Sequence, residues 1–259
     1  MADWRIGCYI GPMTCSLTRR NALVLGAAAM FAKPALAAAK RPVIVELFTS
    51  QGCSSCPPAD AYFKALKDQP DVLALSYHVD YWDYLGWRDT LGSPECSQRQ
   101  YDYAKSRGDR NVYTPQTIIN GGKHFVGSQR ASVSGGIDAA GSEDAAGWVD
   151  MEMTHNKTDV SIIIPAGKPT REATLWLMAF APFVSTEIKK GENAGRTIDY
   201  YNVVRKMVPA GMWHGEAAKI VLPKGSVVPE SCKGWVALLQ EGNVGRVIGA
   251  ATGGTRPNA

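Results

Sequence analysis

The fold is decided by the stretch PVIVELFTSQGCSSCPP, residues 42–58. Residues 43–48 form a nearly continuous apolar run, which is typical of a strand buried on both faces. A turn rich in glycine and cysteine follows, and Pro57 and Pro58 suit the first turn of a helix. The helix predicted over residues 57–67 carries its apolar residues at helical spacing. The stretch therefore predicts a buried strand, a tight turn and a helix, with Cys53 and Cys56 at the junction.

A second strand is predicted directly after this helix, over residues 72–79. Strand, helix and strand within about 35 residues indicate a right-handed crossover between two parallel strands. The fold class expected for this part of the chain is therefore α/β.

The pattern between residues 81 and 147 is mixed. An insertion over about residues 81–110 begins with an aromatic-dense segment and continues with a helix from Ser93 to about Ser106, with Pro94 near its first turn. Residues 116–119 and 123–126 read as a hairpin around an Asn-Gly turn. A weak helix is predicted over residues 129–140, and small residues over 141–147 indicate a linker.

From residue 148 onward, segments with alternating or β-forming residues follow one another at short intervals. The strands predicted there cover residues 149–155, 159–164, 174–180, 185–190, 198–208, 217–222 and 235–240. This spacing is typical of an antiparallel, sandwich-like arrangement. We therefore expect one α/β domain over residues 38–147, with the insertion, and a β-rich C-terminal domain over residues 148–259.

Residues 1–37 have the features of a signal peptide. An eleven-residue apolar run, residues 22–32, follows Arg19 and Arg20 and precedes a small-residue cleavage site ending at Ala37. The run is shorter than the about 20 residues that a membrane-spanning helix needs. Thr18-Arg19-Arg20 also partly matches a twin-arginine signal, so both export routes stay open. The sequence predicts an exported, periplasmic or secreted protein with no membrane span in its mature chain.

The charge of the chain changes meaning once this segment is set aside. The full sequence has 28 basic and 24 acidic residues, a net charge of +4. Four of the basic residues and one acidic residue lie in residues 1–37, which leaves a net charge of +1. No large basic cluster remains, so a nucleic-acid partner is not expected.

The CxxC spacing of Cys53 and Cys56 points to thiol chemistry. A thiol at the start of a helix experiences the positive end of the helix dipole, which favours the thiolate. One thiolate can attack a substrate disulfide while the other resolves the mixed disulfide. Two alternatives stay open: an inert structural disulfide, and half of a zinc site, although no second CxxC or suitably spaced histidine pair accompanies it.

The dipeptide Thr114-Pro115 follows the cysteines and precedes a predicted hairpin strand. In this order, strand, CxxC, helix, strand, Thr-Pro and hairpin resemble the thioredoxin superfamily over roughly residues 42–146. More narrowly, ELFTSQGCSSCPPAD (residues 46–60), HVDYWD (residues 78–83), GEN (residues 191–193) and NVVR (residues 202–205) resemble a family of exported bacterial thioredoxin-like proteins of unknown function. That narrower resemblance spans most of the mature chain and implies no substrate.

The resemblance implies roles for particular residues. Cys53 is then the nucleophile and Cys56 the resolving thiol, while Thr114 and Pro115 hold an extended peptide. Glu46, the one charged residue of the first strand, is a candidate acceptor for the Cys56 proton, unless it pairs with an arginine. The Ser-Ser dipeptide between the cysteines departs from the known oxidoreductases, so the direction of electron flow stays open.

The aromatic residues of the insertion, Trp82 among them, either bind substrate beside the cysteines or pack over the sheet. Cys96 and Cys232 are candidates for a structural disulfide between the insertion and the C-terminal domain. No cofactor is expected. The expected partners are a protein thiol or disulfide and an unidentified redox partner, and the sequence does not indicate an oligomeric state.

Copper delivery is the competing function. Met151, Met153 and His155 alternate along one predicted strand and so share a face, and thioethers with imidazole suit copper(I). Cys53 and Cys56 with His78 form a second candidate set. The alternative for the first set is a methionine-rich core with a histidine at its rim.

Overall fold

The computed structural model describes residues 41–257 of the 259-residue chain, and the predicted signal peptide lies outside the described residues. The first half of the described chain contains β1 (Val43–Thr49), α1 (Pro57–Lys67), β2 (Val72–His78), the short helix η1 (Asp83–Leu85), α2 (Pro94–Arg107), β3 (Gln116–Ile119), β4 (His124–Val126) and α3 (Arg130–Ser142). The second half contains β5 (Glu152–His155), β6 (Asp159–Ile164), β7 (Ala173–Glu187), β8 (Thr197–Trp213), β9 (Ala218–Pro223), α4 (Lys224–Val227), β10 (Gly234–Glu241) and β11 (Val247–Gly254).

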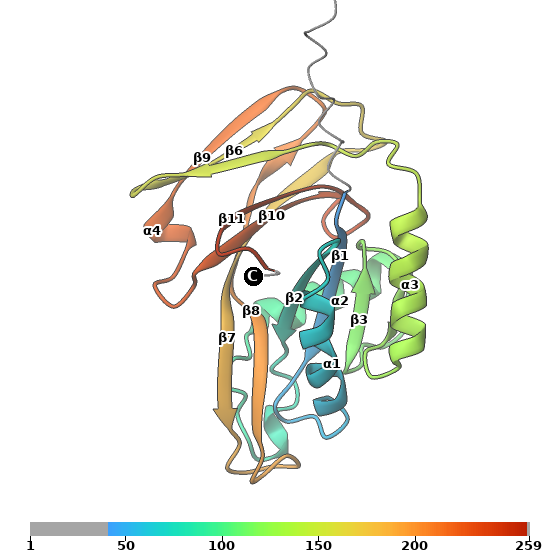
Figure 1. Ribbon diagram of the computed structural model, residues 1–259, viewed down its shortest axis with the longest axis vertical. Coiled ribbons are helices and arrows are strands. Elements are labelled where there is room, and N and C mark those ends of the chain that lie inside the picture. Colours follow the sequence, from blue (N-terminus) through green and yellow to red (C-terminus); the bar gives the residue numbers. More distant parts are fainter. Residues whose placement is uncertain (1–40, 258–259) are drawn as a thin grey trace, which may run out of the picture. The chain divides into compact units, whose positions relative to one another are not determined.

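One mixed sheet of eight strands runs through the protein in the order β11-β10-β7-β8-β2-β1-β3-β4 (Figure 1). Strands β1 and β2 are parallel, as the crossover predicts, and β3 and β4 continue the sheet as antiparallel neighbours. Strand β8 joins β2 in parallel where Ser76 pairs with Val203. The chain after residue 147 thus extends the same sheet, and the described residues 41–257 lie within one compact unit. The two-domain division stays a prediction.

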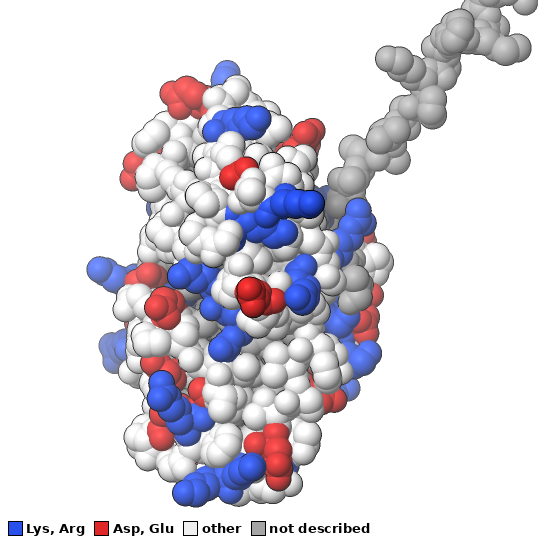
Figure 2. Space-filling model, turned by 90° about the vertical axis from the view of Figure 1, so that its left-hand side faces the viewer, with Lys and Arg blue, Asp and Glu red and all other residues white. Residues whose placement is uncertain are grey.

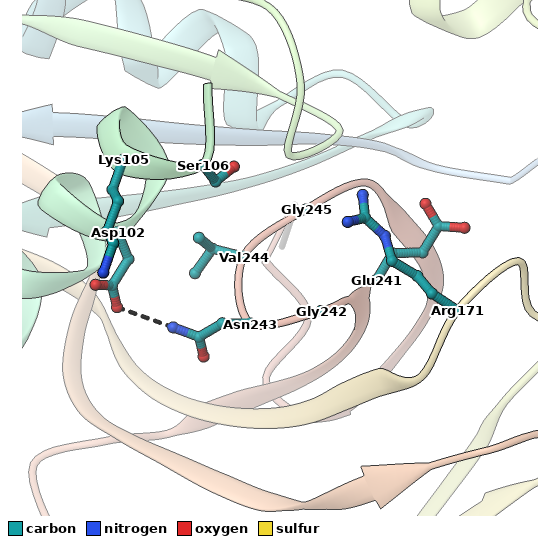
Figure 3. A pocket seen from close by; sticks show the side chains of 9 residues that line it. All are labelled: Asp102, Lys105, Ser106, Arg171, Glu241, Gly242, Asn243, Val244 and Gly245. Atoms are coloured by element: carbon teal, nitrogen blue, oxygen red, sulfur yellow. Dashed lines mark hydrogen bonds between the residues drawn. The ribbon is translucent and has the colours of Figure 1, made fainter. Parts of the chain in front are cut away.

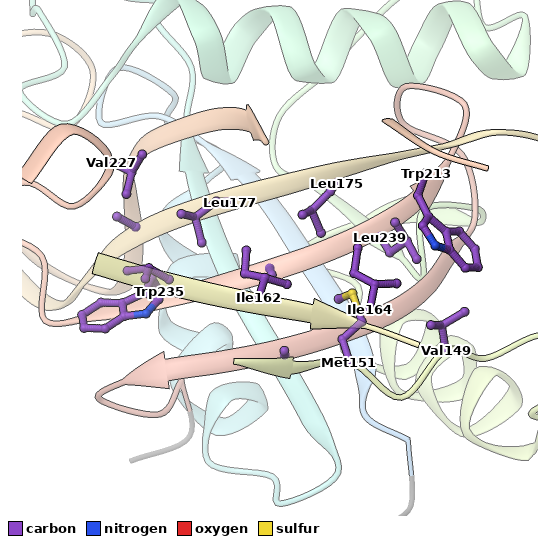
Figure 4. Close-up of a cluster of buried hydrophobic side chains, with 14 of the residues drawn as sticks. Val149, Met151, Ile162, Ile164, Leu175, Leu177, Trp213, Val227, Trp235 and Leu239 are labelled. Carbon is purple, nitrogen blue, oxygen red and sulfur yellow. The ribbon is translucent and has the colours of Figure 1, made fainter. Parts of the chain in front are cut away.

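The second sheet is small and antiparallel, with the order β5-β6-β9. Its apolar side chains pack onto one face of the large sheet and make a hydrophobic core (Figure 4). Ile162 and Ile164 from β6 meet Leu175 and Leu177 from β7 in this core. This part has the face-to-face packing expected of a sandwich, but one of its two layers belongs to the central sheet.

Strand β1 is completely buried because helices cover both faces of the sheet. Val43, Val45 and Leu47 pack with residues of α1 and α3. Ile44 and Phe48 point to the opposite face, where α2 contributes to the core. The alternation of side chains along the strand therefore assigns each residue of β1 to the α1 side or to the α2 side.

The three predicted helices, α1, α2 and α3, begin and end within two residues of the predicted bounds, whereas the short helices η1 and α4 were not predicted. Helix α1 starts with Pro57 and Pro58. Proline has no backbone N–H group, and in the first turn of a helix this group is not needed for a hydrogen bond within the helix. The hydroxyl of Ser93 caps α2 by accepting from the Cys96 amide at 3.2 Å. Gly108 ends α2 with φ of 77°, a conformation that favours glycine.

The strands of the second half differ more from the prediction. Strand β7 is 15 residues long and joins two segments expected to be separate strands, because it continues through an irregularity between Ala179 and Phe180. It forms a long hairpin with the 17-residue strand β8. Strand β11 was not predicted, since its small residues carry little β signal.

Within residues 41–257, no helix is both long and apolar enough to cross a membrane. On the face shown in Figure 2, acidic and basic side chains are interspersed.

Candidate functional site

The cysteine turn lies between the end of β1 and the start of α1. Cys56 is the residue that precedes the helix, and its amide donates to the Cys53 carbonyl at 3.2 Å. Cys53 is 4% exposed and Cys56 is 0% exposed, while Ser54 and Ser55 between them are exposed. Both cysteines are free thiols. Both thiols are thus buried, and Cys53 is the one that retains some exposed surface.

The two thiols have opposite acidities. The hydrogen bond from Cys56, helped by Thr114 and by backbone donors, lowers the pKa of Cys53 to about 7 in spite of burial. Burial, followed by the hydrogen bond to Cys53 and the charge of Asp60, raises the pKa of Cys56 well above its usual value. Near neutral pH, a large fraction of Cys53 is therefore thiolate, whereas Cys56 keeps its proton.

The Thr114–Pro115 loop lies against the cysteine turn. Its peptide bond is cis, and the carbonyl of Thr114 accepts a hydrogen bond from the Cys53 thiol at 3.7 Å. The indole of Trp82 donates to the Thr114 hydroxyl at 2.7 Å and stacks with Tyr84, which is 77% exposed. The structure therefore brings Thr114, Pro115 and Trp82 together beside Cys53.

The acid beside the cysteines is Asp60, to which the sequence analysis gave no role. It lies one helical turn after Cys56, is 3% exposed, and accepts a hydrogen bond from the Thr49 hydroxyl at 2.7 Å. Burial raises its pKa to about 7, against the attraction of His78. The signal was available in the sequence, because positions 56 and 60 are four residues apart and share a helix face.

Glu46 has different partners from those expected of a proton acceptor for Cys56. One oxygen accepts from the Arg99 guanidinium at 2.7 Å, and the other accepts from the Tyr103 hydroxyl. Glu46 shares the α2 side of β1 with Phe48, whereas Thr49 and its partner Asp60 lie on the α1 side. The alternative, in which Glu46 pairs with an arginine, is the one the structure shows.

A second buried pair lies near Asp60. The Nδ1 atom of His78 is 2.9 Å from Asp89, and both side chains are fully buried. Although burial opposes ionisation, His78 and backbone donors hold the pKa of Asp89 below its usual value. The ring of Tyr200 meets the His78 ring edge-on at 4.5 Å.

Three polar atoms in this group have no hydrogen-bond partner: Asp60 Oδ2, His78 Nε2 and the Tyr200 hydroxyl. Such atoms are uncommon inside a protein, because each costs about 1–3 kcal/mol. All three belong to the group of polar side chains behind Cys56, on the α1 side of the sheet.

The tip of the β7–β8 hairpin forms hydrogen bonds with the cysteine turn. The side-chain amide of Asn193 donates to the carbonyls of Gln51 and Cys53, each at 2.9 Å. The Ser54 amide donates to the Glu192 carboxylate at 3.2 Å. These contacts join residues about 140 positions apart in the sequence, so sequence patterns alone did not reveal them.

Cys96 and Cys232 do not form the expected disulfide, since both are free thiols. Cys96 belongs to the core on the α2 side of the sheet, with Met178 and Phe180. Cys232 belongs to the core on the other face, with Leu177. Successive residues of β7 point to opposite faces, so the sheet separates the two thiols.

The methionines considered for copper take part in the packing of the hydrophobic core. No group of three or more histidine, cysteine or acidic side chains in residues 41–257 is placed to hold a metal ion. Met151 is part of the core between the two sheets, Met153 packs against that core, and His155 packs on Trp235. These contacts fit the alternative of a methionine-rich core with a histidine at its rim.

A cavity of about 420 Å³ lies away from the cysteine turn, between α2 and the loop that joins β10 to β11 (Figure 3). Lys105 and Arg171 line it together with Asp102, whose carboxylate accepts a hydrogen bond from Asn243 at 2.9 Å. None of its lining residues belongs to the cysteine turn.

The comparisons with known proteins agree with this architecture. The crystal structure of protein AGR_C_4864 from Agrobacterium tumefaciens matches with a TM-score of 0.70 and 34% sequence identity, over 81% of this chain and 92% of that one. HBP35 of Porphyromonas gingivalis has a related fold, with a TM-score of 0.54 and 12% identity over 83% of this chain and 75% of that one. No curated protein matches the chain.

The family model that matches the chain covers residues 44–240, from the first strand to the last residues of β10. This range includes both cysteines of the turn, Asp60 and the hairpin tip. The chain therefore belongs to DUF1223, a family described as proteins of unknown function.

Proposed function

We propose that this protein is a thiol–disulfide oxidoreductase of thioredoxin-like design that acts through Cys53 and Cys56. The observation that carries the proposal is the geometry of the turn, in which Cys56 precedes helix α1 and Cys53 lies against the cis Thr114–Pro115 loop. In this setting the pKa of Cys53 is lowered to about 7 and that of Cys56 is raised well above its usual value. A nucleophile must be ionised at working pH, whereas a resolving thiol must stay protonated until the mixed disulfide has formed. An inert structural disulfide needs neither property.

The reaction transfers one disulfide bond. The Cys53 thiolate attacks a substrate disulfide, forms a mixed disulfide with one substrate sulfur and releases the other as a thiolate. Cys56 then loses its proton and attacks the Cys53 sulfur, which forms the Cys53–Cys56 disulfide and releases the second substrate thiolate. The substrate gains two electrons and the protein loses two. The reverse direction uses the same atoms.

Asp60 suits the role of acceptor for the Cys56 proton. Its charge acts on Cys56, and its pKa of about 7 lets it both accept and release a proton near neutral pH. One of its oxygens is already bonded to Thr49, and the other has no partner. Asp60 takes the place that the sequence analysis offered to Glu46.

The substrate side of the site is formed by Thr114, Pro115 and Trp82. In the proposed function the backbone of Thr114 pairs with an extended polypeptide, and Trp82 packs against it. Because Cys53 is only 4% exposed, the disulfide must be presented on a slender segment. We also propose that residues 1–37 direct export, so that the substrates are exported proteins.

A trapping experiment tests this function. In a Cys56→Ser variant the mixed disulfide at Cys53 cannot be resolved, so it accumulates and its partner can be identified by mass spectrometry. Cys53→Ser is expected to trap nothing, and Cys96→Ser, which changes a buried thiol whose pKa is about 11, is expected to behave as the parent protein. A redox titration gives the opposing outcome: a Cys53–Cys56 potential below about −300 mV is that of a structural disulfide and would overturn the proposal.

A further inference from the structure

The hairpin tip places a fixed negative charge at the reactive cysteine. Glu192 accepts from the amide of Ser54, the residue directly after Cys53. The neighbouring Asn193 is 1% exposed and bonded to two carbonyls of the turn, so the tip is anchored and the carboxylate stays in place.

This charge is available to a substrate. Glu192 is exposed, and within residues 41–257 it forms no ion pair, although Lys189 and Lys190 precede it in the same turn. The other acidic side chains nearby are less exposed to solvent. Asp89 is buried and paired with His78, and Asp60 is buried below Cys56. Asp80 and Asp83, on either side of Trp82, are half-buried. Glu192 is therefore the exposed acid that is bonded to the cysteine turn, next to Cys53.

We propose that Glu192 is a specificity-determining residue, which makes Cys53 favour disulfides flanked by positively charged groups over disulfides flanked by carboxylates. The inference rests on the proposed exchange reaction and names its substrate class: polypeptide disulfides with lysine or arginine next to the cysteine. The charge acts on the encounter between Cys53 and the substrate, because opposite charges attract and like charges repel over a few ångströms in water.

The experiment compares two small disulfides of opposite charge. Reduced mature protein is mixed with cystamine, which is cationic, or with glutathione disulfide, which is anionic, and the two second-order rate constants are measured. The variant Glu192→Gln removes the charge but keeps an oxygen for the Ser54 amide. The matched control is Glu187→Gln, which makes the same change on an exposed residue of the same hairpin.

We compare the ratio of the cystamine rate constant to the glutathione disulfide rate constant. A change in the intrinsic reactivity of Cys53 affects both rate constants equally and cancels in this ratio. In Glu192→Gln we expect this ratio to fall roughly tenfold at low ionic strength, because the variant no longer attracts the cationic disulfide or repels the anionic one. In Glu187→Gln it is expected to stay at the parental value. At 1 M salt, where the screening length is about 3 Å, the preference of the parent protein is expected to shrink.

Three results would overturn the inference. An unchanged ratio in Glu192→Gln shows that the charge does not select substrates. A change in both rate constants by the same factor shows that Glu192 acts on the Cys53 thiol alone. If the reduced parent protein reacts with neither disulfide although Cys53 is alkylated readily, the exchange function itself fails, and the inference fails with it.

Discussion

A buried acid lies on each face of the central sheet, and the two acids differ in how fully their oxygens are hydrogen-bonded. On the α2 side, Glu46 has both oxygens bonded, to Arg99 and to Tyr103, and Arg99 also donates to Gln240. On the α1 side, Asp60 has one bonded oxygen and one without a partner. A buried carboxylate whose two oxygens are both bonded is held in place, even though the Nη1 atom of Arg99 lacks a partner, whereas an oxygen without a partner can take up a proton. The difference separates a structural carboxylate, Glu46, from the proposed proton acceptor, Asp60.

The largest effect on stability is expected when the buried ion pair between Glu46 and Arg99 is broken. Glu46→Gln leaves the Arg99 guanidinium buried without its counter-charge, so the free energy of unfolding is expected to fall by about 3–5 kcal/mol. Urea denaturation measures it. The double variant Glu46→Leu with Arg99→Met removes both charges and is expected to recover most of the loss. The opposite result would be a Glu46→Gln protein that is as stable as the parent but whose Cys53 no longer reacts. It would mean that Glu46, and not Asp60, is the acid that supports the thiol chemistry.

The next effect is kinetic and belongs to the unsatisfied acid. Asp60→Asn removes the acceptor for the Cys56 proton, so resolution of the mixed disulfide is expected to slow by about 100-fold, as for loss of a general base. The rate of Cys53 alkylation should change far less. A pulse of a chromogenic disulfide followed by release of its second thiolate measures the resolving step. Asp68→Asn, an exposed acid at the end of the same helix, serves as the control.

The third effect is a dependence of stability on pH. The pKa of Asp60 is raised from 3.8 to about 7 by burial. Between these values the folded protein holds a proton that the unfolded chain has lost, so this group's contribution to stability is complete below pH 3.8 and falls as pH rises to about 7. The slope is at most about 1.4 kcal/mol per pH unit. The difference in unfolding free energy between the parent and Asp60→Asn, measured from pH 4 to 8, should show this decline. A flat difference would mean that Asp60 ionises normally.

The sequence was sufficient wherever the signal is local. The apolar run before Cys53, the two prolines after Cys56 and the cap at Ser93 predict the strand and helices that the structure contains. Each depends on neighbours within a turn or a few residues. The separation of the two cysteines into a thiol with some exposed surface and a fully buried one follows from the same local geometry.

The assignment of the acids could not be made in this way. Whether Glu46 or Asp60 lies beside Cys56 depends on which face of the sheet each side chain occupies. Arg99, the partner that binds Glu46 on the α2 side, is 53 residues away from it in the sequence. The hairpin tip is a stronger case, since Asn193 reaches a turn 140 residues earlier. The same limit applies to β8, whose parallel pairing with β2 makes the two halves share one sheet.

The contact between Asn193 and the cysteine turn also sets a sequence of events. Ribosomes synthesise the chain from its N-terminus, so Cys53 and Cys56 emerge long before residue 193 is available. During that interval the carbonyls of Gln51 and Cys53 have no side-chain amide to bind. The turn acquires its final form, and Cys53 its acidic neighbour Glu192, only when the β7–β8 hairpin has folded back onto it. The reactive centre is thus finished last, although its cysteines are made early.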